Sequence, residues 1–588
     1  MRVNKYDVDE KNTNFSLKNL KRALKYSKKY KKQLLLVFFI HLSITLISLI
    51  YAKIIQYGID NITKKMIFES LVKFFIISAS LQVVVVLLHN FRNKKLTKVN
   101  ENVIEDLKND LFTHLQYLSS NYYDTRPHGK ILVRLTEYSE NVSTLITNGL
   151  IDTILQLLSI TLTLIFMIIT NISLTLITLL GVIILTIIFS FTTKIKRKLK
   201  HQINNKKSNM NAYFYETIKG LDTTKIFNRS YENEKIHDSL TDAFFEAYCK
   251  YIKYSNISWS STAIVSNTVQ IAIYTIGIFY LFPSITLGTI VAMGSYSTRF
   301  WNPIKNLFLR MDEFIESMTS LERILETLDE PITIKNNENP VKKEIEGNIE
   351  FKDVVFQYND DKIILDNISF KIKQGQKVAI VGETGSGKTT IANLIARFYD
   401  INKGNIYIDN TDIKDYDLNC LRRQVSIMQQ DNYLFTDTIM NNLKYGNINI
   451  SDKEIINLCK KIDLDDWIKE FANGYETVLE NHGNTLSDGE KQLLSYIRVL
   501  INDPKILVLD EATSKIDVRT ENLIQNKINN LIKDKTTITI AHRLSTIVNS
   551  DIILFIKDKK ILEIGNHQEL MNKKGEYYKL FSSQDNLI

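Results

Sequence analysis

Long apolar segments in the first half of this 588-residue chain constrain its fold more than any other feature. An α-helix needs about 20 mostly apolar residues to cross the hydrocarbon core of a bilayer. Segments of this length and character lie near residues 34–55, 71–91, 149–170, 173–193, 260–282 and 286–308. A short turn around Asn171 separates the third from the fourth, so these two are expected to form a hairpin. The last is the least apolar, since it contains Arg299, Asn302 and two serines. Six such segments in one half of a chain argue against a soluble helical core and predict a six-helix transmembrane domain.

Clusters of lysine and arginine flank these segments on one side, and such clusters mark the cytoplasmic side of a membrane. They precede the first segment (KNLKRALKYSKKYKKQ) and follow the second (RNKKLTK) and the fourth (KIKRKLKHQ). Both termini are therefore expected in the cytoplasm, and the N-terminal cluster is expected to lie on the membrane surface as a basic amphipathic helix. The net charge of +9 suits an anionic lipid surface, and no nucleic-acid partner is expected.

Two connections on the cytoplasmic side are unusually long. They follow the second and the fourth apolar segments, are rich in charged residues, and contain no turn cluster apart from Arg-Pro-His-Gly at 126–129. Helices over these stretches would continue the membrane spans tens of ångströms into the cytoplasm at about 1.5 Å per residue. We therefore expect these extensions to contact another part of the protein there.

Arg299 is the most conspicuous polar residue of the spans. A charge in a transmembrane segment usually faces a cavity or a partner, and near a helix end it can reach the interface instead. Both interpretations remain open from the sequence, and His41 and Gln82 are weaker cases of the same kind. The cysteines Cys249, Cys420 and Cys459 lack metal-ligand spacing and fit a reduced compartment.

The second half of the chain has a different pattern. A polar stretch at 335–344 is followed, from about Gly347, by short β-branched strands that alternate with helical segments, as in an α/β domain. The strand KVAIV (377–381) leads into GETGSGKTT (382–390) and then into a helix. This matches the phosphate-binding motif G-x-x-x-x-G-K-T in its required strand–loop–helix setting.

The chemistry of this loop follows from its residue types. Glycines let backbone N–H groups surround phosphates, and the helix N-terminus adds its positive end. Lys388 is expected to reach the β- and γ-phosphates and Thr389 to hold Mg²⁺. The residues of the loop expected to bind ATP are Gly382, Gly385, Ser386, Gly387, Lys388, Thr389 and Thr390.

Two further strands complete the predicted ATPase site. In KILVLDE (505–511), Asp510 is placed to hold Mg²⁺ through water and Glu511 to polarise the attacking water as general base. The strand TTITIAH delivers His542 to the same sheet edge, where it can contact the γ-phosphate. Each of these signals is weak alone and gains strength from the phosphate-binding loop in the same domain.

A helix start is predicted at TLSDGEKQ (485–492). Ser487 and Glu490 have the S-x-x-E spacing of a capping box, and Leu493, Leu494 and Ile497 then recur at helical spacing.

Taken together, the motifs resemble those of the ATP-binding-cassette exporters, in the half-transporter form with one membrane domain fused to one nucleotide-binding domain. The resemblance covers nearly the whole chain and includes ETIKGLDTTKIFNR and SLERI. It implies an α-helical six-span membrane domain plus an α/β P-loop nucleotide-binding domain, ATP and Mg²⁺ as cofactors, and a dimer with a second half-transporter. The expected domains are a cytoplasmic segment 1–33, the membrane domain 34–330, a linker 331–346 and the nucleotide-binding domain 347–588.

The resemblance also implies roles for single residues. Tyr358 in FQY is expected to stack on adenine. Gln430 in IMQQDNYLF is similar to the glutamine that senses Mg²⁺ and the membrane domain. Asp517 in SKID matches the aspartate of the loop after the catalytic glutamate, and His542 the switch histidine.

The segment LSDGE (486–490) stands where this family has LSGGQ, the signature that completes the ATP site of the opposite subunit. Ser487 and the Gly489 N–H are therefore expected to meet the γ-phosphate of the partner's ATP, next to Glu490. Asp488 for glycine and Glu490 for glutamine are departures that add negative charge near a triphosphate. Whether the dimer is a homodimer or a heterodimer stays open.

The expected function is ATP-driven export of an amphipathic or hydrophobic substrate, such as a drug, lipid or peptide, across the plasma membrane by alternating access. The alternative is a nucleotide-gated channel or a regulatory subunit with the same ATPase head. A soluble DNA-tethering ATPase is excluded by the six apolar segments, and an importer is disfavoured because the domains are fused. Arg299, Trp301 and Trp259 are candidate lining residues of the substrate path.

Overall fold

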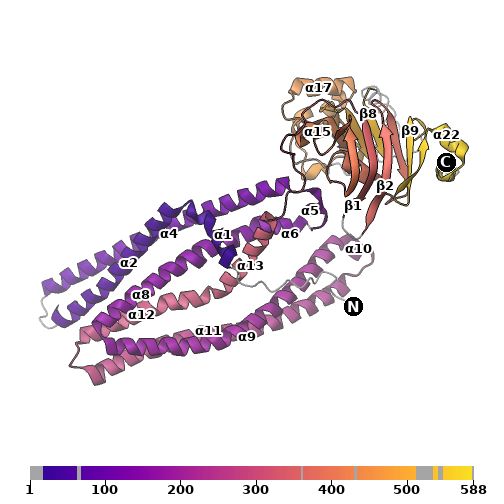
Figure 1. Ribbon diagram of the computed structural model, residues 1–588. Coiled ribbons are helices and arrows are strands. Elements are labelled where there is room, and N and C mark those ends of the chain that lie inside the picture. The colour runs from indigo at the N-terminus through magenta and orange to yellow at the C-terminus, as the bar shows by residue number, and fades with distance from the viewer. Residues whose placement is uncertain are drawn as a thin grey trace. The chain divides into compact units, whose positions relative to one another are not determined.

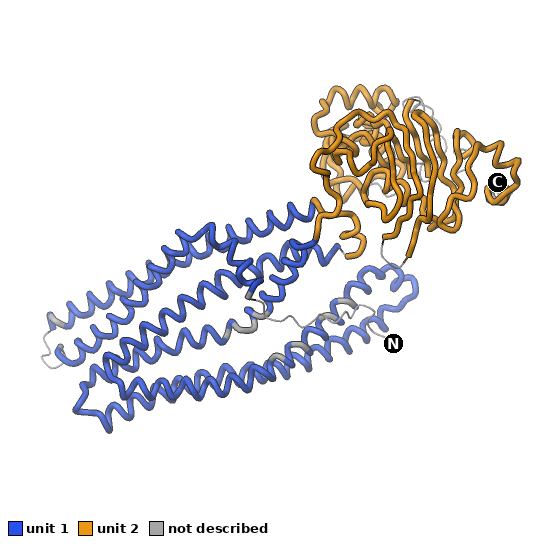
Figure 2. Tube along the Cα trace, viewed as in Figure 1, with its two compact units in different colours: residues 1–116, 128–330 blue, residues 117–127, 331–588 orange. Residues whose placement is uncertain are grey.

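The computed structural model describes residues 17–62, 68–126, 128–358, 362–428, 433–510, 534–540 and 547–585. The chain forms two compact units (Figure 2). The helical unit comprises residues 1–116 and 128–330, and the sheet unit comprises residues 117–127 and 331–588. The segment 117–127 thus belongs to the sheet unit although it lies between two parts of the helical unit in sequence, which no local pattern indicates.

The helical unit contains several helices much longer than a bilayer is thick (Figure 1). Its α-helices are α1 (Leu17–Lys28), α2 (Lys31–Tyr57), α4 (Phe68–Tyr117, which reaches the boundary of the unit), α6 (His128–Val133), α7 (Ser139–Thr144), α8 (Asp152–Thr170), α9 (Ile172–Lys219), α10 (Leu221–Ile226), α11 (Ser230–Ile276), α12 (Leu287–Leu309) and α13 (Met311–Leu328). The π-helical turns are η1 (Gly58–Ile62), η2 (Arg134–Tyr138), η3 (Leu145–Ile151) and η4 (Gly277–Leu281).

The long connections that follow the second and fourth apolar segments are helical, as predicted. Helices α4, α9 and α11 contain 50, 48 and 47 residues, so each runs about 70–75 Å at 1.5 Å per residue. Helices α9 and α11 pack against each other extensively. Their contact includes Ile203 of α9 and Ala247 and Tyr251 of α11.

Five helical stretches among the described residues are long and apolar enough to cross a membrane. They are Lys31–Asn61, Leu71–Tyr117, His128–Thr170, Ile172–Lys219 and Ser230–Leu281. The sixth predicted span coincides with α12, a 23-residue helix whose polar side chains lower its hydropathy. Helix α12 packs against α2, α8 and α11. The helical membrane domain is confirmed, and α12 is the helix that the sequence predicts as its sixth span.

The packing of the spans is tight where small residues allow it. Asn171 joins α8 to α9 as the predicted turn, and its side chain accepts a hydrogen bond of 3.0 Å from Leu174 N. A Cβ on Gly181 of α9 would lie 2.5 Å from a methyl group of Val269 and 2.9 Å from the ring of Trp301. Only glycine therefore permits α9, α11 and α12 to approach this closely.

The basic helix α1 is fixed to the rest of the helical unit by charged contacts. Arg22 pairs with Asp329 at 2.6 Å, and this contact lowers the pKa of the Asp329 carboxyl. Just after α1, Lys29 and Tyr30 both bind Asp106, at 2.7 and 2.6 Å. The helix predicted for the N-terminal basic cluster is thus present.

The sheet unit is built on two sheets (Figure 1). The smaller has the order β2-β1-β4-β5, with antiparallel pairs. The larger has the order β10-β9-β3-β8-β7-β6, and β9 to β6 are mutually parallel. The strands are β1 (Ile349–Gln357), β2 (Ile363–Ile372), β3 (Lys377–Gly382), β4 (Lys403–Ile408), β5 (Thr411–Asp412), β6 (Val425–Met428), β7 (Ile506–Asp510), β8 (Thr536–Ile540), β9 (Ile552–Lys557) and β10 (Lys560–Gly565).

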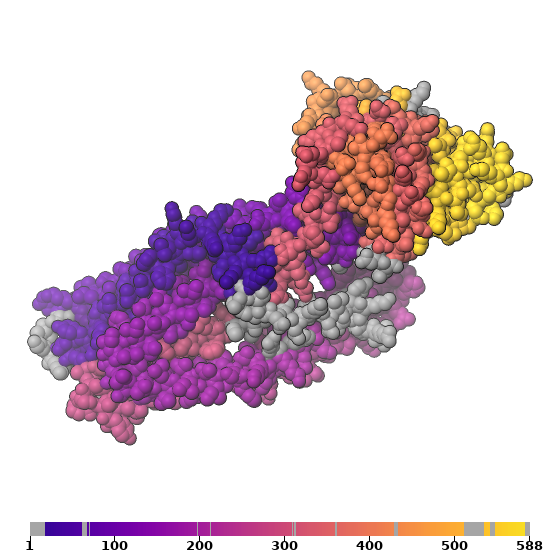
Figure 3. Space-filling model, viewed as in Figure 1, coloured from indigo at the N-terminus to yellow at the C-terminus, as the bar shows by residue number. Residues whose placement is uncertain are grey.

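Helices cover the larger sheet and form a second core beside it. Strands β3 and β7 are buried almost throughout, as expected for the centre of a parallel sheet with covered faces. The helices are α14 (Lys388–Ile395), α15 (Leu418–Gln424), α16 (Ile439–Lys444), α17 (Asp452–Lys461), α18 (Asp465–Lys469), α19 (Asp488–Leu500), α22 (His567–Lys573) and α23 (Glu576–Asp585). Helices α16 to α19 enclose their own hydrophobic cluster. The C-terminal elements form one end of the sheet unit, yellow in Figure 3.

Candidate ATP-binding site and membrane path

The predicted ATP site is assembled at one edge of the larger sheet. Strand β8 lies between β3 and β7, and the residues Ile380, Ile540 and Asp510 are in register across the three strands. The carboxyl ends of these parallel strands therefore share one edge, where ligands bind in open α/β sheets. The phosphate-binding loop follows β3 at this edge, and Asp510 ends β7 there.

The glycines of the loop have conformations and neighbours that exclude other residues. Gly382 and Gly387 have φ angles of 157° and 103°. A Cβ on Gly382 would lie 2.2 Å from Ile556 O, and a Cβ on Gly387 would lie 2.6 Å from a methyl carbon of Leu365. The loop can therefore turn sharply into α14 only with glycine at both positions.

Lys388 and Ser386 present donors at this loop. Lys388 is 6% exposed, and its Nζ donates to the carbonyls of Gly382 at 2.8 Å and Glu383 at 2.9 Å. The Oγ of Ser386 is buried and has no hydrogen-bond partner among the described residues. A buried donor without an acceptor is unfavourable, so a phosphate oxygen fits this position.

Two of the three residues predicted to hold Mg²⁺ meet in the structure, and the third, Gln430, lies outside the described residues. Thr389, in the first turn of α14, donates from Oγ1 to Asp510 Oδ2 at 3.2 Å, although the two are 121 positions apart. Mg²⁺ prefers hard oxygen ligands and is usually held by few protein groups together with phosphates and water. A hydroxyl and a carboxylate beside a phosphate-binding loop therefore fit this ion.

Tyr358 lies beside the same helix. Its hydroxyl is 3.1 Å from Thr390 Oγ1 of α14. Its half-buried ring packs edge-on against Tyr399, with ring centroids 5.0 Å apart. This position suits an aromatic ring that stacks on the base of a nucleotide whose phosphates occupy the loop.

The signature segment forms the capping box that its sequence predicts. Ser487 is the N-cap of α19, and its Oγ accepts from Glu490 N at 3.3 Å. The Glu490 carboxylate accepts from Ser487 N at 2.7 Å and from the Ser487 hydroxyl at 2.8 Å. Gly489 lies in the first turn of the same helix. The hydroxyl expected to meet the partner's ATP is therefore already engaged by a carboxylate of its own helix.

Two residues of this unit were not singled out from the sequence. Arg498 of α19 donates to Asn442 O at 2.9 Å and to Tyr433 O at 2.9 Å, and it thereby holds the signature helix against α16. Burial lowers the pKa of its guanidinium. A single arginine within an amphipathic helix carries no local sign of such a role, because its partners come from another part of the chain.

Tyr399 is the second such residue. Its hydroxyl donates to a carboxylate oxygen of Asp124 in the short helix α5 (Ser120–Asp124), which belongs to the segment 117–127. Burial and the neighbouring Asp124 carboxylate raise the pKa of Tyr399. The segment 117–127 thus reaches the aromatic cluster that contains Tyr358.

Four residues with predicted roles lie outside the described residues. They are Gln430, Glu511, Asp517 and His542. Glu511 directly follows Asp510 at the end of β7, and His542 comes two positions after Ile540 at the end of β8. Their roles stay predictions.

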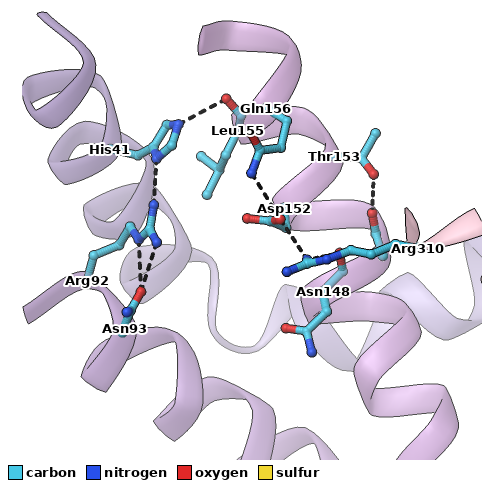
Figure 4. A network of polar contacts seen from close by, with 10 residues as sticks. His41, Arg92, Asn93, Asn148, Asp152, Thr153, Leu155, Gln156 and Arg310 are labelled. Atoms are coloured by element: carbon cyan, nitrogen blue, oxygen red, sulfur yellow. Dashed lines mark hydrogen bonds and ion pairs between the residues drawn. The ribbon is translucent and has the colours of Figure 1, made fainter. Parts of the chain in front are cut away.

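In the helical unit, a polar network surrounds His41 (Figure 4). Arg92 Nη1 is 2.8 Å from His41 Nδ1, and His41 Nε2 is 3.0 Å from Leu155 O. Arginine can only donate, so Nδ1 is the acceptor and the hydrogen on Nε2 points to the carbonyl. In the same region Arg310 pairs with Asp152 at 2.7 Å. His41 therefore serves as a neutral structural link between helices.

The candidate residues of the substrate path have different surroundings. Arg299 of α12 is half-buried. Trp301 is 1% exposed and lies in the core between α9, α11 and α12. Trp259 of α11 is 55% exposed. Only Arg299 is both partly exposed and located inside the bundle. The proposed role of these three residues in a substrate path stays a prediction.

Comparisons with known proteins agree with this architecture. Residues 34–304 match the family "ABC transporter transmembrane region", and residues 365–514 match the family "ABC transporter". The uncharacterized ABC transporter ATP-binding protein YknV of Bacillus subtilis (strain 168) is 35% identical over 97% of this chain and 95% of its own length. The putative multidrug export ATP-binding/permease protein YgaD of the same organism is 32% identical over 96% and 99%.

A solved structure is also similar over almost the whole chain. It is that of a bacterial Atm1-family ABC exporter with ATP bound, with a TM-score of 0.82, 27% sequence identity, and coverage of 95% of this chain and 98% of the other. Sequence and structure therefore agree on one assignment. The chain belongs to the ATP-binding-cassette exporters, as a half-transporter that couples ATP hydrolysis to transport across a membrane.

Proposed function

We propose that this chain, as half of a dimer, exports an amphipathic or hydrophobic substrate from the cytoplasm, with Mg²⁺ and ATP bound at the edge of the larger sheet. The observation that carries the proposal is the contact of Thr389 with Asp510 beside the phosphate-binding loop, in a chain whose other unit is a six-helix membrane domain. The relatives named as putative multidrug exporters support a drug or lipid-like substrate.

Within this proposal each residue of the site has a defined task. Lys388 leaves its two carbonyl partners and binds the β- and γ-phosphates. Thr389, Asp510 and Gln430 hold Mg²⁺, which, when bound, supplies positive charge to the phosphate oxygens. Glu511 orients and deprotonates the attacking water.

His542 and Tyr358 complete the proposed site. His542 contacts the γ-phosphate, and Tyr358 stacks on the adenine. The exposed Ser487 and Gly489, with Glu490, face the ATP of the partner, and Asp517 lies in the loop that follows Glu511.

Transport follows from a two-state bundle whose equilibrium is biased by nucleotide. ATP bound at the dimer interface favours the closed arrangement of the nucleotide-binding domains and the outward-facing state of the spans, and hydrolysis restores the inward-facing state. In this proposal the sheet unit and both termini lie in the cytoplasm of a plasma-membrane protein. The basic segments beside α2, α4 and α9 support this orientation.

Inverted membrane vesicles that contain the full chain provide the test. We expect fluorescent amphiphiles to accumulate inside against their gradient when Mg²⁺ and ATP are added. Glu511→Gln is expected to lower ATP hydrolysis and accumulation at least about 100-fold, because it removes the general base, while ATP still binds.

The matched control is Glu476→Gln, which neutralises an exposed carboxylate of the same unit and is expected to keep both activities. A different result would contradict pumping: with a non-hydrolysable ATP analogue, the fluorescent amphiphile reaches equal concentrations on both sides of the membrane. That result would identify a nucleotide-gated channel.

A further inference from the structure

Arg299 differs from the other arginines at or within the spans. Arg92 has His41 Nδ1 at 2.8 Å, and Arg310 has Asp152 at 2.7 Å and Asn148 O at 3.1 Å (Figure 4). The Nε of Arg299 is buried without a hydrogen-bond partner, and the guanidinium forms no ion pair within the described ranges.

The depth of Arg299 excludes the simplest explanation for such a charge. It lies twelve positions after Leu287 and ten before Leu309, the two ends of α12. At 1.5 Å per residue these separations are about 18 and 15 Å, which places Arg299 near the middle of a hydrocarbon core of about 30 Å. An arginine side chain reaches the interface only from positions near a helix end. Its charge therefore needs an acceptor inside the bundle.

A mostly apolar cavity of about 380 Å³ lies between α2 and α4. Its walls include Tyr51, Ile55, Phe74, Ser78 and Gln82. Tyr51 lines this cavity and follows Leu49 of α2 by two positions. The carbonyl of Leu49 accepts a hydrogen bond of 3.2 Å from Tyr296 of α12, three positions before Arg299. The buried Oγ of Ser78 has no hydrogen-bond partner in the described part of the chain. The volume suits a small ligand with an apolar body.

We propose that Arg299 binds the anionic group of the transported molecule while the cavity between α2 and α4 takes its hydrocarbon part, so that the substrates are anionic amphiphiles. This inference rests on the proposed export function. A guanidinium binds carboxylate, sulfonate and phosphate groups with two parallel hydrogen bonds. The attraction is stronger in a medium of low dielectric constant than in water, and a cationic amphiphile is repelled by the same charge.

The test uses the full chain, purified and reconstituted in phosphatidylcholine vesicles. Three probes share one oleoyl chain and differ in head-group charge: N-oleoyl taurine is anionic, N-oleoyl ethanolamine is neutral and oleylamine is cationic. The measurements are the concentration that gives half-maximal stimulation of ATP hydrolysis and the ATP-driven accumulation of each probe. We expect N-oleoyl taurine to act at a concentration at least tenfold lower than the neutral probe and to be accumulated.

Variants of α12 assign this preference to the charge. Arg299→Gln is expected to abolish the tenfold difference, and Arg299→Lys, which keeps the charge, to retain most of it. The matched control is Thr298→Ala, because Thr298 is exposed and bonds only to the carbonyl of its own helix at Gly294. It is expected to leave the preference unchanged. If the Arg299→Gln chain does not assemble, a second measurement on the unsubstituted chain tests the proposal. N-oleoyl taurine that carries a diazirine in its tail is photo-crosslinked to the protein, and the labels are expected on α2 and α4.

The outcomes separate this inference from the export proposal. Accumulation of the neutral or cationic probe alone, or labels confined to other helices, would overturn the anionic class and leave export standing. Passive, ATP-independent equilibration of all three probes would overturn export itself. The same anionic chemistry is present in resident lipids. Activation by added phosphatidylglycerol, with no accumulation of N-oleoyl taurine, would show a bound lipid at Arg299 and overturn the substrate assignment.

Discussion

Glu490 has two effects that oppose each other at a single residue. Its carboxylate binds both the backbone N–H and the hydroxyl of Ser487, at 2.7 and 2.8 Å, and an N-cap of this kind contributes about 1 kcal/mol to helix stability. The same carboxylate adds negative charge where a triphosphate of the partner is expected and holds the hydroxyl proton that the phosphate needs. Folding of α19 tolerates glutamate here, whereas we expect it to weaken nucleotide binding.

Glu490→Gln together with Asp488→Gly is therefore expected to tighten ATP binding. Charge effects at a helix terminus are about 0.3–1 kcal/mol each, which corresponds to roughly two- to fivefold in affinity per charge. Titration with a fluorescent ATP analogue measures the change. Thermal unfolding should change little, because glutamine also serves a capping box.

The chain offers a matched control for this pair. Ser451 and Glu454 form the same capping box at the start of α17, with the carboxylate 2.9 Å from Ser451 N. Glu454→Gln should leave ATP affinity unchanged. If Glu490→Gln and Glu454→Gln changed ATP affinity equally, the role of Glu490 would be helix capping alone.

At the scale of elements, the short helix α5 is connected to the phosphate-binding helix through two tyrosines. The carboxylate of Asp124 accepts from the Tyr399 hydroxyl, the rings of Tyr399 and Tyr358 meet edge-on, and the Tyr358 hydroxyl is 3.1 Å from Thr390 of α14. A continuous set of contacts thus joins Tyr358, the residue proposed to stack on adenine, to the segment 117–127.

Tyr399→Phe isolates the hydrogen bond, since it keeps the ring and removes the hydroxyl. The lost bond is worth about 1 kcal/mol or somewhat more with a charged acceptor. We expect ATP affinity to stay near that of the unsubstituted chain, while stimulation of ATP hydrolysis by transported amphiphiles falls several-fold. The control is Tyr407→Phe on β4, a half-buried tyrosine of the same unit. Full stimulation in Tyr399→Phe would rule out this contact as a path of coupling.

The elements differ in how well the sequence predicts them. The sixth span was expected at 286–308, and α12 occupies Leu287–Leu309, because apolar composition acts locally. The capping box at Ser487 and the turn at Asn171 are local in the same sense and are confirmed. The docking of 117–127 depends on the contact between Asp124 and Tyr399, which are 275 positions apart. The local periodicity and motif spacing of a sequence cannot predict a contact between residues so far apart.

For the whole molecule, the open question is the identity of the second half of the dimer. The chain contains Lys388, Thr389, Asp510 and Glu511, which are the residues expected from its own side of an ATP site that the partner's signature completes. We therefore expect the purified chain alone to hydrolyse ATP in lipid vesicles as a homodimer. The unsubstituted chain can also be mixed with the Glu511→Gln chain before the dimers assemble. The rate of ATP hydrolysis should then fall more steeply than the fraction of mutant chain rises, because the two nucleotide-binding domains close together on both ATP sites.

The heterodimer gives a different result. A chain inactive by itself, with activity restored by a second half-transporter, would identify a partner whose signature completes the site around Lys388. In that case the LSDGE segment of this chain would face the partner's nucleotide, and the Glu490 and Asp488 substitutions would change activity only in the mixed dimer.

The lengths of α9 and α11 have a mechanical consequence. Two long helices that pack side by side bend less than one and behave as a paired lever. A rod of about 70 Å converts a tilt of about 5° at one end into a displacement of roughly 6 Å at the other, about the spacing of one helical turn. Small angular changes at one end of this pair are thus amplified, without any change of secondary structure, into movements at the other end wide enough for a lipid tail to enter or leave.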